Sequence, residues 1–453
     1  MPLPAPRPSG FDHPASLMAA LFFIGGLMFF VQRSYHPAPP PSEEVVAPWT
    51  TAAFREAKRR ATRSQVIAEN QNLPLTPAND SRWKSFLSAV KWNADRRPEV
   101  RAALARRLDF LKAPDQAPPP STEVLRLAME TAFGLFPTQL EPEMRRIFER
   151  DTDPRRLAMA GAWLARLDGS PAHRHLLEET ITGRMPGWGN EPRLLALVTE
   201  LRSPRAAIIQ ERPPLEDILT APFDGRPVIF SLQRLDRRFL GRAVVRSAEG
   251  SFLVEPDGTP FSVTQFALSA SGLPGTLTNG NTPSGIFEIE EISRTKNTAI
   301  GPSETIILGL PLEYDKSWTE SRYDALLPAS WKSWWPIHEA WWAGQARRTE
   351  ILAHGTAIDP TPWMDTVFAG QTPSHGCLTC DETWDPATGR RLTSEQARLV
   401  AALRKAGGAP AWLVVIELDN EARPVTPEDT ARLLKNLRRQ DFTSNPIAAT
   451  PFP

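Results

Sequence analysis

The hydrophobic pattern of this 453-residue chain changes period once, near Pro213, and this change limits the possible folds more than any other feature. Before it, apolar residues recur at helical spacing in segments such as LAMETAFGLF, LAMAGAWLARL and LLALVTEL. After it, short β-type runs at 228–232, 243–245 and 286–289 alternate with turn residues. The pattern predicts an all-α part over residues 82–205, followed by a mostly β part over residues 206–420 with one or two helices.

Helix starts in the first part lie near Pro120, Pro154 and Pro192. Proline is favoured in the first turn of a helix because its missing N–H would have no partner there. A recurrence of roughly 35 to 40 residues is typical of helical-pair repeats, so one interpretation is a short HEAT-like array. The other is an irregular helical domain without a true repeat. Either surface is expected to bind a protein partner or to hold a neighbouring domain.

The N-terminal part of the chain contains an almost wholly apolar run, ASLMAALFFIGGLMFFV, at residues 15–31. Its length is at the lower end of what crosses a membrane, and the residues that follow form a poor cleavage site, which favours an uncleaved anchor over a signal peptide. We expect a short cytoplasmic N-terminus at 1–13 and a transmembrane helix at 14–33. The protein would then be a single-pass protein of the inner cell membrane, with the rest of the chain outside the cytoplasm.

Two further segments flank the predicted domains. Residues 34–81 are expected to form a proline-rich stalk and a basic helix, whose charged face would contact anionic lipid or solvent. Residues 421–453 are expected to form a tail with one amphipathic helix. Acidic and basic residues balance at 52 each, so no overall charge argues for a nucleic acid partner.

The residues that carry chemistry are concentrated in Ser374-His375-Gly376-Cys377, and the chain has only two cysteines, Cys377 and Cys380. A thiol with an ordinary pKa of about 8.5 is mostly protonated at neutral pH, and a nearby imidazole can take its proton. Gly376 allows a tight turn, so the N–H groups of Gly376 and Cys377 are candidates to face an oxyanion.

Together with His354-Gly355-Thr356 upstream, this segment resembles the L,D-transpeptidase (YkuD-like) family, whose signature is a histidine, a spacer and then Ser/Thr-His-Gly-Cys. A second match is NTPSGIF at residues 281–287, which is similar to the family's Thr-Pro-x-Gly-x-Phe segment. The resemblance covers residues 222–420, under half of the chain. It implies a mostly β catalytic domain that faces the periplasm and cell wall.

The resemblance also implies roles for individual residues. Cys377 would be the nucleophile, and His354 the general base with its ring oriented by a backbone carbonyl. Ser374 would hydrogen-bond within the turn, and His375 would either shape the site or simply pack. The thiolate would attack the third residue of a peptidoglycan stem peptide and form a thioester. An amine from another stem would then make a crosslink, or water would make the enzyme an L,D-carboxypeptidase or related hydrolase.

The chain departs from the family pattern at the expected substrate contacts. Thr379 stands where the family usually has Arg or Asn, and the spacer of 19 residues between His354 and Ser374 is longer than usual. Further candidates for substrate contact are Gly355, Trp335 and Trp363. Trp335 belongs to a tryptophan-rich insertion at 314–345, which would pack on the β part, cover the active site as a lid, or contact a membrane interface.

Cys377-Leu378-Thr379-Cys380 also forms a C-x-x-C pattern. Outside the cytoplasm this pair would be able to close a disulfide that blocks the nucleophile, and a redox protein is one alternative class. A zinc site from both cysteines, His354 and His375 would consume the nucleophile, so we expect no metal and no cofactor. A non-enzymatic scaffold of the cell envelope, with a partner on the helical domain, is the other alternative.

Overall fold

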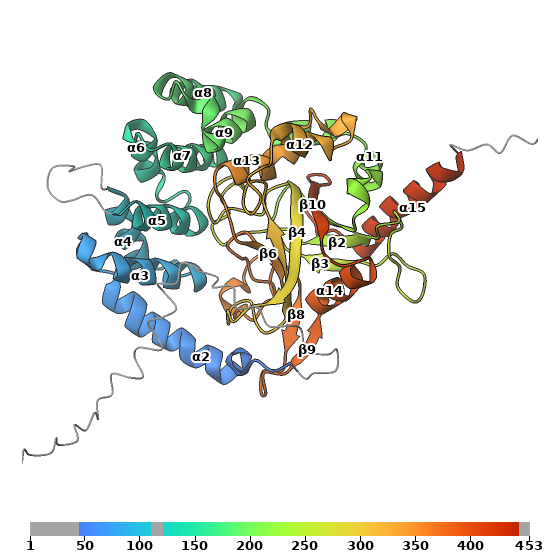
Figure 1. The fold of residues 1–453 in the computed structure, drawn as a ribbon. Helices are drawn as coiled ribbons and strands as arrows, with labels where there is room; N and C mark the ends of the chain where they lie inside the picture. The colour runs from blue at the N-terminus through green and yellow to red at the C-terminus, as the bar shows by residue number, and fades with distance from the viewer. Residues whose placement is uncertain (1–44, 110–120, 444–453) are drawn as a thin grey trace, which may run out of the picture.

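The computed structural model describes residues 45–109 and 121–443, with side chains as far as 437, and consists of helices followed by a mixed sheet (Figure 1). The helices of the first part are α2 (Ala52–Ala61), α3 (Asp80–Trp92), α4 (Pro98–Leu108), α5 (Thr122–Leu135), α6 (Glu141–Arg150), α7 (Pro154–Leu167), α8 (Pro171–Arg184) and α9 (Pro192–Arg202). The remaining helices are α10 (Arg205–Ile208), α11 (Leu215–Thr220), α12 (Glu320–Ala325), α13 (Glu339–Gln345), α14 (Glu395–Lys405) and α15 (Pro427–Thr443).

Helices α3 to α9 stack in two rows, which we call the helical unit. One row contains α3, α5, α7 and α9, and the other contains α4, α6 and α8, with each helix packed on its neighbours (Figure 1). Helix starts are set by proline in the first turn and by side-chain caps: Asp153 accepts hydrogen bonds from the N–H groups of Arg155 and Arg156. This two-row arrangement is the geometry of stacked helical pairs.

The sheet has eight strands in the order β3-β2-β1-β10-β4-β5-β6-β7, and it nearly closes into a barrel. Its strands are β1 (Val228–Gln233), β2 (Gly241–Arg246), β3 (Val263–Gln265), β4 (Gly285–Arg294), β5 (Glu304–Gly309), β6 (Ile351–His354), β7 (Leu378–Thr379) and β10 (Ala411–Glu417). The two edges meet where Phe266, just after β3, exchanges backbone hydrogen bonds of 2.7 and 2.9 Å with Thr379 of β7. A separate hairpin pairs β8 (Glu382–Trp384) with β9 (Arg391–Ser394).

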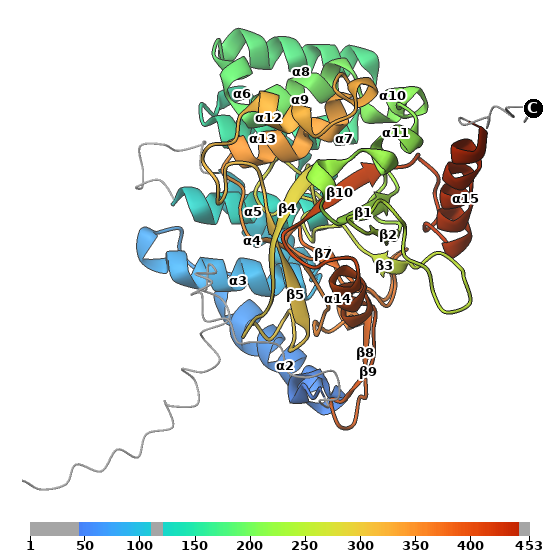
Figure 2. The same ribbon diagram turned by 45° about the vertical axis from the view of Figure 1, so that its right-hand side comes forward.

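The central strands are buried on both faces, so alternate residues supply two different cores. Trp412, Val414 and Ile416 of β10 pack with the tryptophan-rich insertion, α11 and α15, whereas Leu413 and Val415 pack with α14 on the other face. The indoles of the insertion that join the first core are Trp318, Trp331, Trp334, Trp341 and Trp342. Figure 2 shows α13 of this insertion lying against α9 of the helical unit. Of the three interpretations of the insertion, packing is the one that matches the structure.

One loop, residues 268–282, joins the helical unit to the barrel. Leu273 and Leu277 from this loop lie in the core of the helical unit. The approach is close, because a Cβ added to Gly134 of α5 would lie 2.5 Å from the carbonyl oxygen of Ala270. The helical unit therefore packs directly on the segment that leads to the Asn281-Thr282-Pro283 motif.

The fold differs from the sequence-based prediction in two respects. Within the described residues, no helix is both long and apolar enough to cross a membrane, and the predicted span 14–33 lies outside them. The single-pass anchor and the inner-membrane location are therefore corrected and are not carried forward. In addition, residues 206–420 contain more than the one or two predicted helices. The insertion folds as α12, α13 and 3₁₀ turns, and α10, α11 and α14 lie elsewhere in the same part of the chain.

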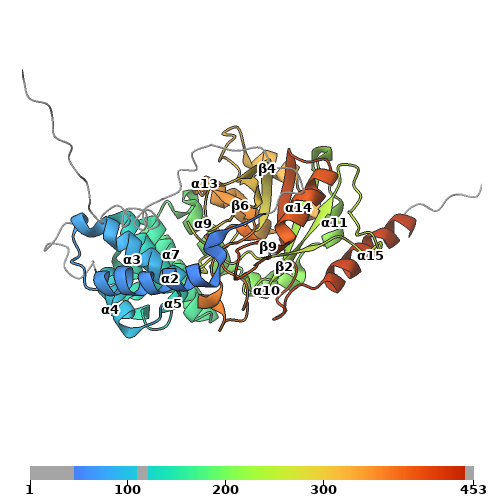
Figure 3. The ribbon, with the colours of Figure 1, turned by 90° about the horizontal axis from the view of Figure 1, so that it is seen from below.

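The basic helix also has a role that the sequence did not indicate. Arg55 of α2 donates to the carbonyl oxygens of Ala357 and Ile358 at 3.2 and 3.3 Å, and Arg59 contacts Asp359 and Thr361. Seen from below in Figure 3, α2 runs from the helical unit toward β9. Two of its arginines therefore bind the loop that follows His354.

Candidate active site

The parallel pairing of β6 and β7 brings the two halves of the motif together. Ala353 lies opposite Leu378 and His354 opposite Thr379, so Cys377 immediately precedes β7 beside the start of β6. Continuing this register places the Cα atoms of His354 and Cys377 roughly 8 Å apart, from about 3.3 Å per residue and about 4.8 Å between strands. Alternation puts both side chains on one face, while Ala353, Leu378 and Cys380 point into the core.

The Ser-His-Gly-Cys turn is held by its own side chains and by the Asn-Thr-Pro motif. The Ser374 hydroxyl accepts a hydrogen bond from the Gly376 N–H at 2.9 Å and donates to the Cys377 carbonyl at 2.8 Å. Thr282 donates to the Gly376 carbonyl at 2.9 Å. Gly376 has a φ of 106°, which explains the need for glycine in the turn.

The predicted role of Ser374 within the turn is therefore confirmed, but that of the Gly376 N–H as an oxyanion donor is not. The Gly376 N–H already donates its hydrogen bond to the Ser374 hydroxyl. The Cys377 N–H has no acceptor among the described residues, so it is the donor of the turn that a bound oxyanion would find free.

His354 is buried at the end of β6, and its ring is oriented by the neighbouring backbone. Nδ1 is hydrogen-bonded to the carbonyl oxygen of Gly355, which fixes the proton on Nδ1 and leaves Nε2 as the acceptor. Burial lowers the pKa of His354 to about 4, although this hydrogen bond opposes the shift. The imidazole is therefore neutral at pH 7, the protonation state that a general base requires.

Cys377 is half-buried, and its thiol donates to the carbonyl oxygen of Glu350 at 3.7 Å. Burial raises the pKa of this thiol to about 11. A backbone hydrogen bond from Leu352 and then the charge of Arg348 act in the opposite direction, and the charge of Glu350 adds to the rise. No hydrogen bond joins the sulfur to the His354 ring in the part of the chain described, and the thiol proton is donated to the Glu350 carbonyl instead.

His375 faces the helical unit. Its ring lies 4.8 Å from that of Trp92 of α3, and burial, followed by the charges of Lys91 and Arg126, holds its pKa well below the usual range. Its Nε2 is buried without a hydrogen-bond partner among the described residues. This geometry corresponds to the packing interpretation of His375, and it shows that the helical unit contributes to the wall beside the motif.

Cys380 cannot act together with Cys377. Both thiols are free, and Cys380 is fully buried in the core on the opposite face of the strand. This placement on opposite faces does not favour the disulfide hypothesis or the redox interpretation. The same separation rules out a zinc site that contains both cysteines.

The candidate substrate contacts lie in different places. Thr379 is 1% exposed, and its hydroxyl has no hydrogen-bond partner among the residues that the structure describes. Gly355 leaves space for Glu382, since an added Cβ would lie 2.2 Å from the carboxyl carbon. Trp363 is buried against Phe368 beside the barrel closure. Trp335 is not brought to the motif: it stacks 6.0 Å from Trp342 and donates to the Ser203 carbonyl at 3.1 Å.

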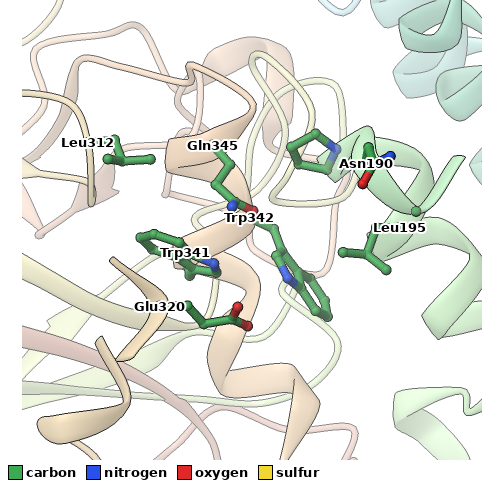
Figure 4. A pocket seen from close by; sticks show the side chains of 9 residues that line it. Asn190, Leu195, Leu312, Glu320, Trp341, Trp342 and Gln345 are labelled. Atoms are coloured by element: carbon green, nitrogen blue, oxygen red, sulfur yellow. The ribbon is translucent and has the colours of Figure 1, made fainter. Parts of the chain in front are cut away.

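A cavity of about 490 Å³ lies between the helical unit and the tryptophan-rich insertion (Figure 4). It is lined by Gly189, Asn190, Pro192, Leu195, Leu312, Glu320, Trp341, Trp342 and Gln345. None of the predicted catalytic residues lines it. The insertion therefore borders this cavity, and the lid interpretation finds no support in its contacts.

Three residues at the site escaped the sequence analysis: Arg348, Glu350 and Trp92. A backbone carbonyl such as that of Glu350 leaves no trace in a sequence pattern. Trp92 comes from a helix some 280 residues upstream of the motif, as the numbering shows. The Arg347-Arg348 pair reads as an ordinary charged turn, and only the fold buries one of the two arginines.

Comparisons of the chain with protein-family models, with curated proteins and with solved structures found no match.

Proposed function

We propose that this protein is a cysteine acyltransferase of the L,D-transpeptidase type, which acts on peptidoglycan stem peptides through Cys377. The observation that carries the proposal is the β6–β7 pairing, which places a neutral histidine with an oriented ring beside the Ser-His-Gly-Cys turn. A thiol and a neutral imidazole on one face of neighbouring strands are the parts that nucleophilic acyl transfer needs.

In the proposed first step, Nε2 of His354 accepts the thiol proton while Sγ of Cys377 forms a bond to the carbonyl carbon of the third stem residue. The Cys377 N–H stabilises the oxyanion. The carbon–nitrogen bond to the terminal D-alanine then breaks, and the imidazolium returns the proton to the leaving amine. In the second step an acceptor amine attacks the thioester, His354 takes its proton, and the thiol is restored.

The test uses purified peptidoglycan fragments with mass analysis of the products. A crosslinked dimer with release of D-alanine supports transpeptidation, and D-alanine release without a dimer supports the carboxypeptidase. Cys377→Ala should abolish both, and Cys380→Ala is the matched control because its thiol lies in the core on the opposite face. A carbapenem, which acylates enzymes of this family, should add its mass to Cys377. Unchanged turnover in Cys377→Ala would refute the enzyme proposal, and binding of fragments without turnover would favour a scaffold.

A further inference from the structure

The bend at residues 346–350, between α13 and β6, contacts the nucleophile from outside the motif. Arg347 and Glu350 adopt left-handed backbone conformations with φ of 59° and 63°, which non-glycine residues hold only where their surroundings compensate. The bend is fixed by a hydrogen bond from the Arg348 N–H to the Ala343 carbonyl at 2.9 Å and by one from the Glu350 N–H to the Glu313 carboxylate at 2.9 Å. The backbone carbonyl of Glu350 accepts a hydrogen bond from the Cys377 thiol.

The side chain of Arg348 points into the protein and is only 4% exposed. Its guanidinium donates to the carbonyls of Gly280 and Asn281, both at 2.6 Å, and to that of Gly275. These residues belong to the loop that continues into Thr282, which binds the Gly376 carbonyl. One side chain therefore holds the loop that supports the nucleophile turn.

The same guanidinium lies directly against that turn. A Cβ added to Gly376 would lie 1.8 Å from Nη2 of Arg348, so the glycine adjoining Cys377 is in contact with the cation. All hydrogen-bond partners of the guanidinium are neutral carbonyls, and no carboxylate among the described residues forms an ion pair with it. The charges that act on the guanidinium are, in order of size, those of Glu339, Cys377, Glu130 and Glu313. Three of them are carboxylates that oppose its effect without a direct hydrogen bond, and in a buried site the remaining positive charge acts on the nearby thiolate.

We propose that Arg348 is a positioning residue for Cys377, which anchors the 275–282 loop and supplies the positive charge that favours the thiolate as the proton leaves. The idea rests on the proposed function in assigning the nucleophile to Cys377. The two effects depend on different properties of the side chain. The positive charge favours ionisation of the thiol, whereas the planar guanidinium, with its several N–H donors, holds the loop.

The experiment measures the rate of Cys377 alkylation by iodoacetamide as a function of pH, with mass spectrometry to assign the modified cysteine. Because this reaction requires only a thiolate, it is independent of any peptidoglycan activity. In Arg348→Gln the alkylation rate near pH 8 should fall about tenfold, which corresponds to one unit of thiol pKa. Arg348→Lys should recover most of that rate, because it keeps the charge. Arg347→Gln is the matched control: it removes an exposed charge from the adjacent position and should alkylate like the wild type.

Carbapenem acylation of Cys377 tests the second effect. Arg348→Lys should be acylated at least several-fold more slowly than the wild type, because lysine cannot hold three carbonyls in one plane. A folded Arg348→Gln variant that alkylates at the wild-type rate would overturn the proposal. If that variant does not fold, a wild-type acylation rate in Arg348→Lys would overturn it instead. Absence of carbapenem acylation in the wild type would refute the proposed function, while the alkylation comparison would still decide the role of Arg348.

Discussion

At the scale of single residues, burial controls the protonation of the two proposed catalytic groups. The pKa of Cys377 is raised to about 11 and that of His354 is lowered to about 4, so the resting pair is a neutral thiol and a neutral imidazole. A preformed thiolate–imidazolium pair would need the opposite shifts. General-base removal of the proton during attack is the mechanism that this environment favours.

His354 sets the first prediction, on acid dependence. The acylation rate of Cys377 should fall as the pH drops through about 4, because protonated Nε2 cannot accept the thiol proton. His354→Ala should lose on the order of a hundredfold at neutral pH. The check is a pH–rate profile of carbapenem acylation by mass spectrometry. A wild-type profile that is flat from pH 7 down to pH 3 in folded protein would contradict the role of His354.

The second prediction concerns how the stability of the protein depends on pH through Glu313. Burial raises the pKa of its carboxyl to about 7, above the unfolded value of about 4.5, so the native state binds the proton more tightly. By linkage, its contribution to the free energy of unfolding is fully present below about pH 4.5 and is lost as the pH rises to about 7, by at most roughly 3 kcal/mol. Glu313→Gln should flatten this decline, as measured by urea unfolding at pH 5 and pH 8. An equal decline in both proteins would show that another group causes it.

At the scale of elements, the close packing of α5 on the loop 268–282 supports the third prediction. Gly134→Ala should destabilise the protein by about 1–3 kcal/mol, because the new Cβ meets the backbone carbonyl of Ala270, which a side-chain rotation cannot relieve. Gly183→Ala near the end of α8 is the matched control. Nothing lies within 4 Å of its added Cβ, so it should stabilise by about 0.5–1 kcal/mol. Thermal unfolding of both variants decides, and equal midpoints would argue against the close approach.

At the scale of the whole molecule, Arg205 of α10 links the helical unit to the barrel, because it also pairs with Glu200 of α9 at 3.1 Å. Its guanidinium pairs with Glu339 of α13 at 2.9 Å and with Glu417 of β10 at 3.0 Å, and both carboxylates are 3% exposed. Arg237 shares Glu417 at 3.0 Å. The two parts of the chain therefore meet through a buried charge network.

The fourth prediction concerns this network. Arg205→Met should cost about 3–5 kcal/mol, because it leaves buried carboxylates without their partner. Arg145→Met is the control, since Arg145 pairs with Glu141 at the surface, where both side chains are more than a third exposed and the pair contributes about 0–1 kcal/mol. Chemical denaturation monitored by tryptophan fluorescence measures both. A loss in Arg205→Met no larger than that in the control would mean that the network contributes little to stability.

Local sequence patterns determined much of this protein. Helices begin where proline, serine or aspartate allows the first turn, as at Pro154 and Pro171. Short apolar runs between turn residues formed strands such as β1 and β10. Both effects act over a few neighbouring residues. The Ser374 hydrogen bonds within the turn are local in the same sense.

Only the tertiary structure decided how distant segments meet. It buried Arg348 against Gly376, turned Cys380 into the core away from Cys377, and placed Trp92 on His375. It also packed the tryptophan-rich insertion into the core, where the sequence had left three interpretations open. These outcomes depend on strand pairing and on which faces become buried, and these long-range contacts leave no signal in the spacing of nearby residues.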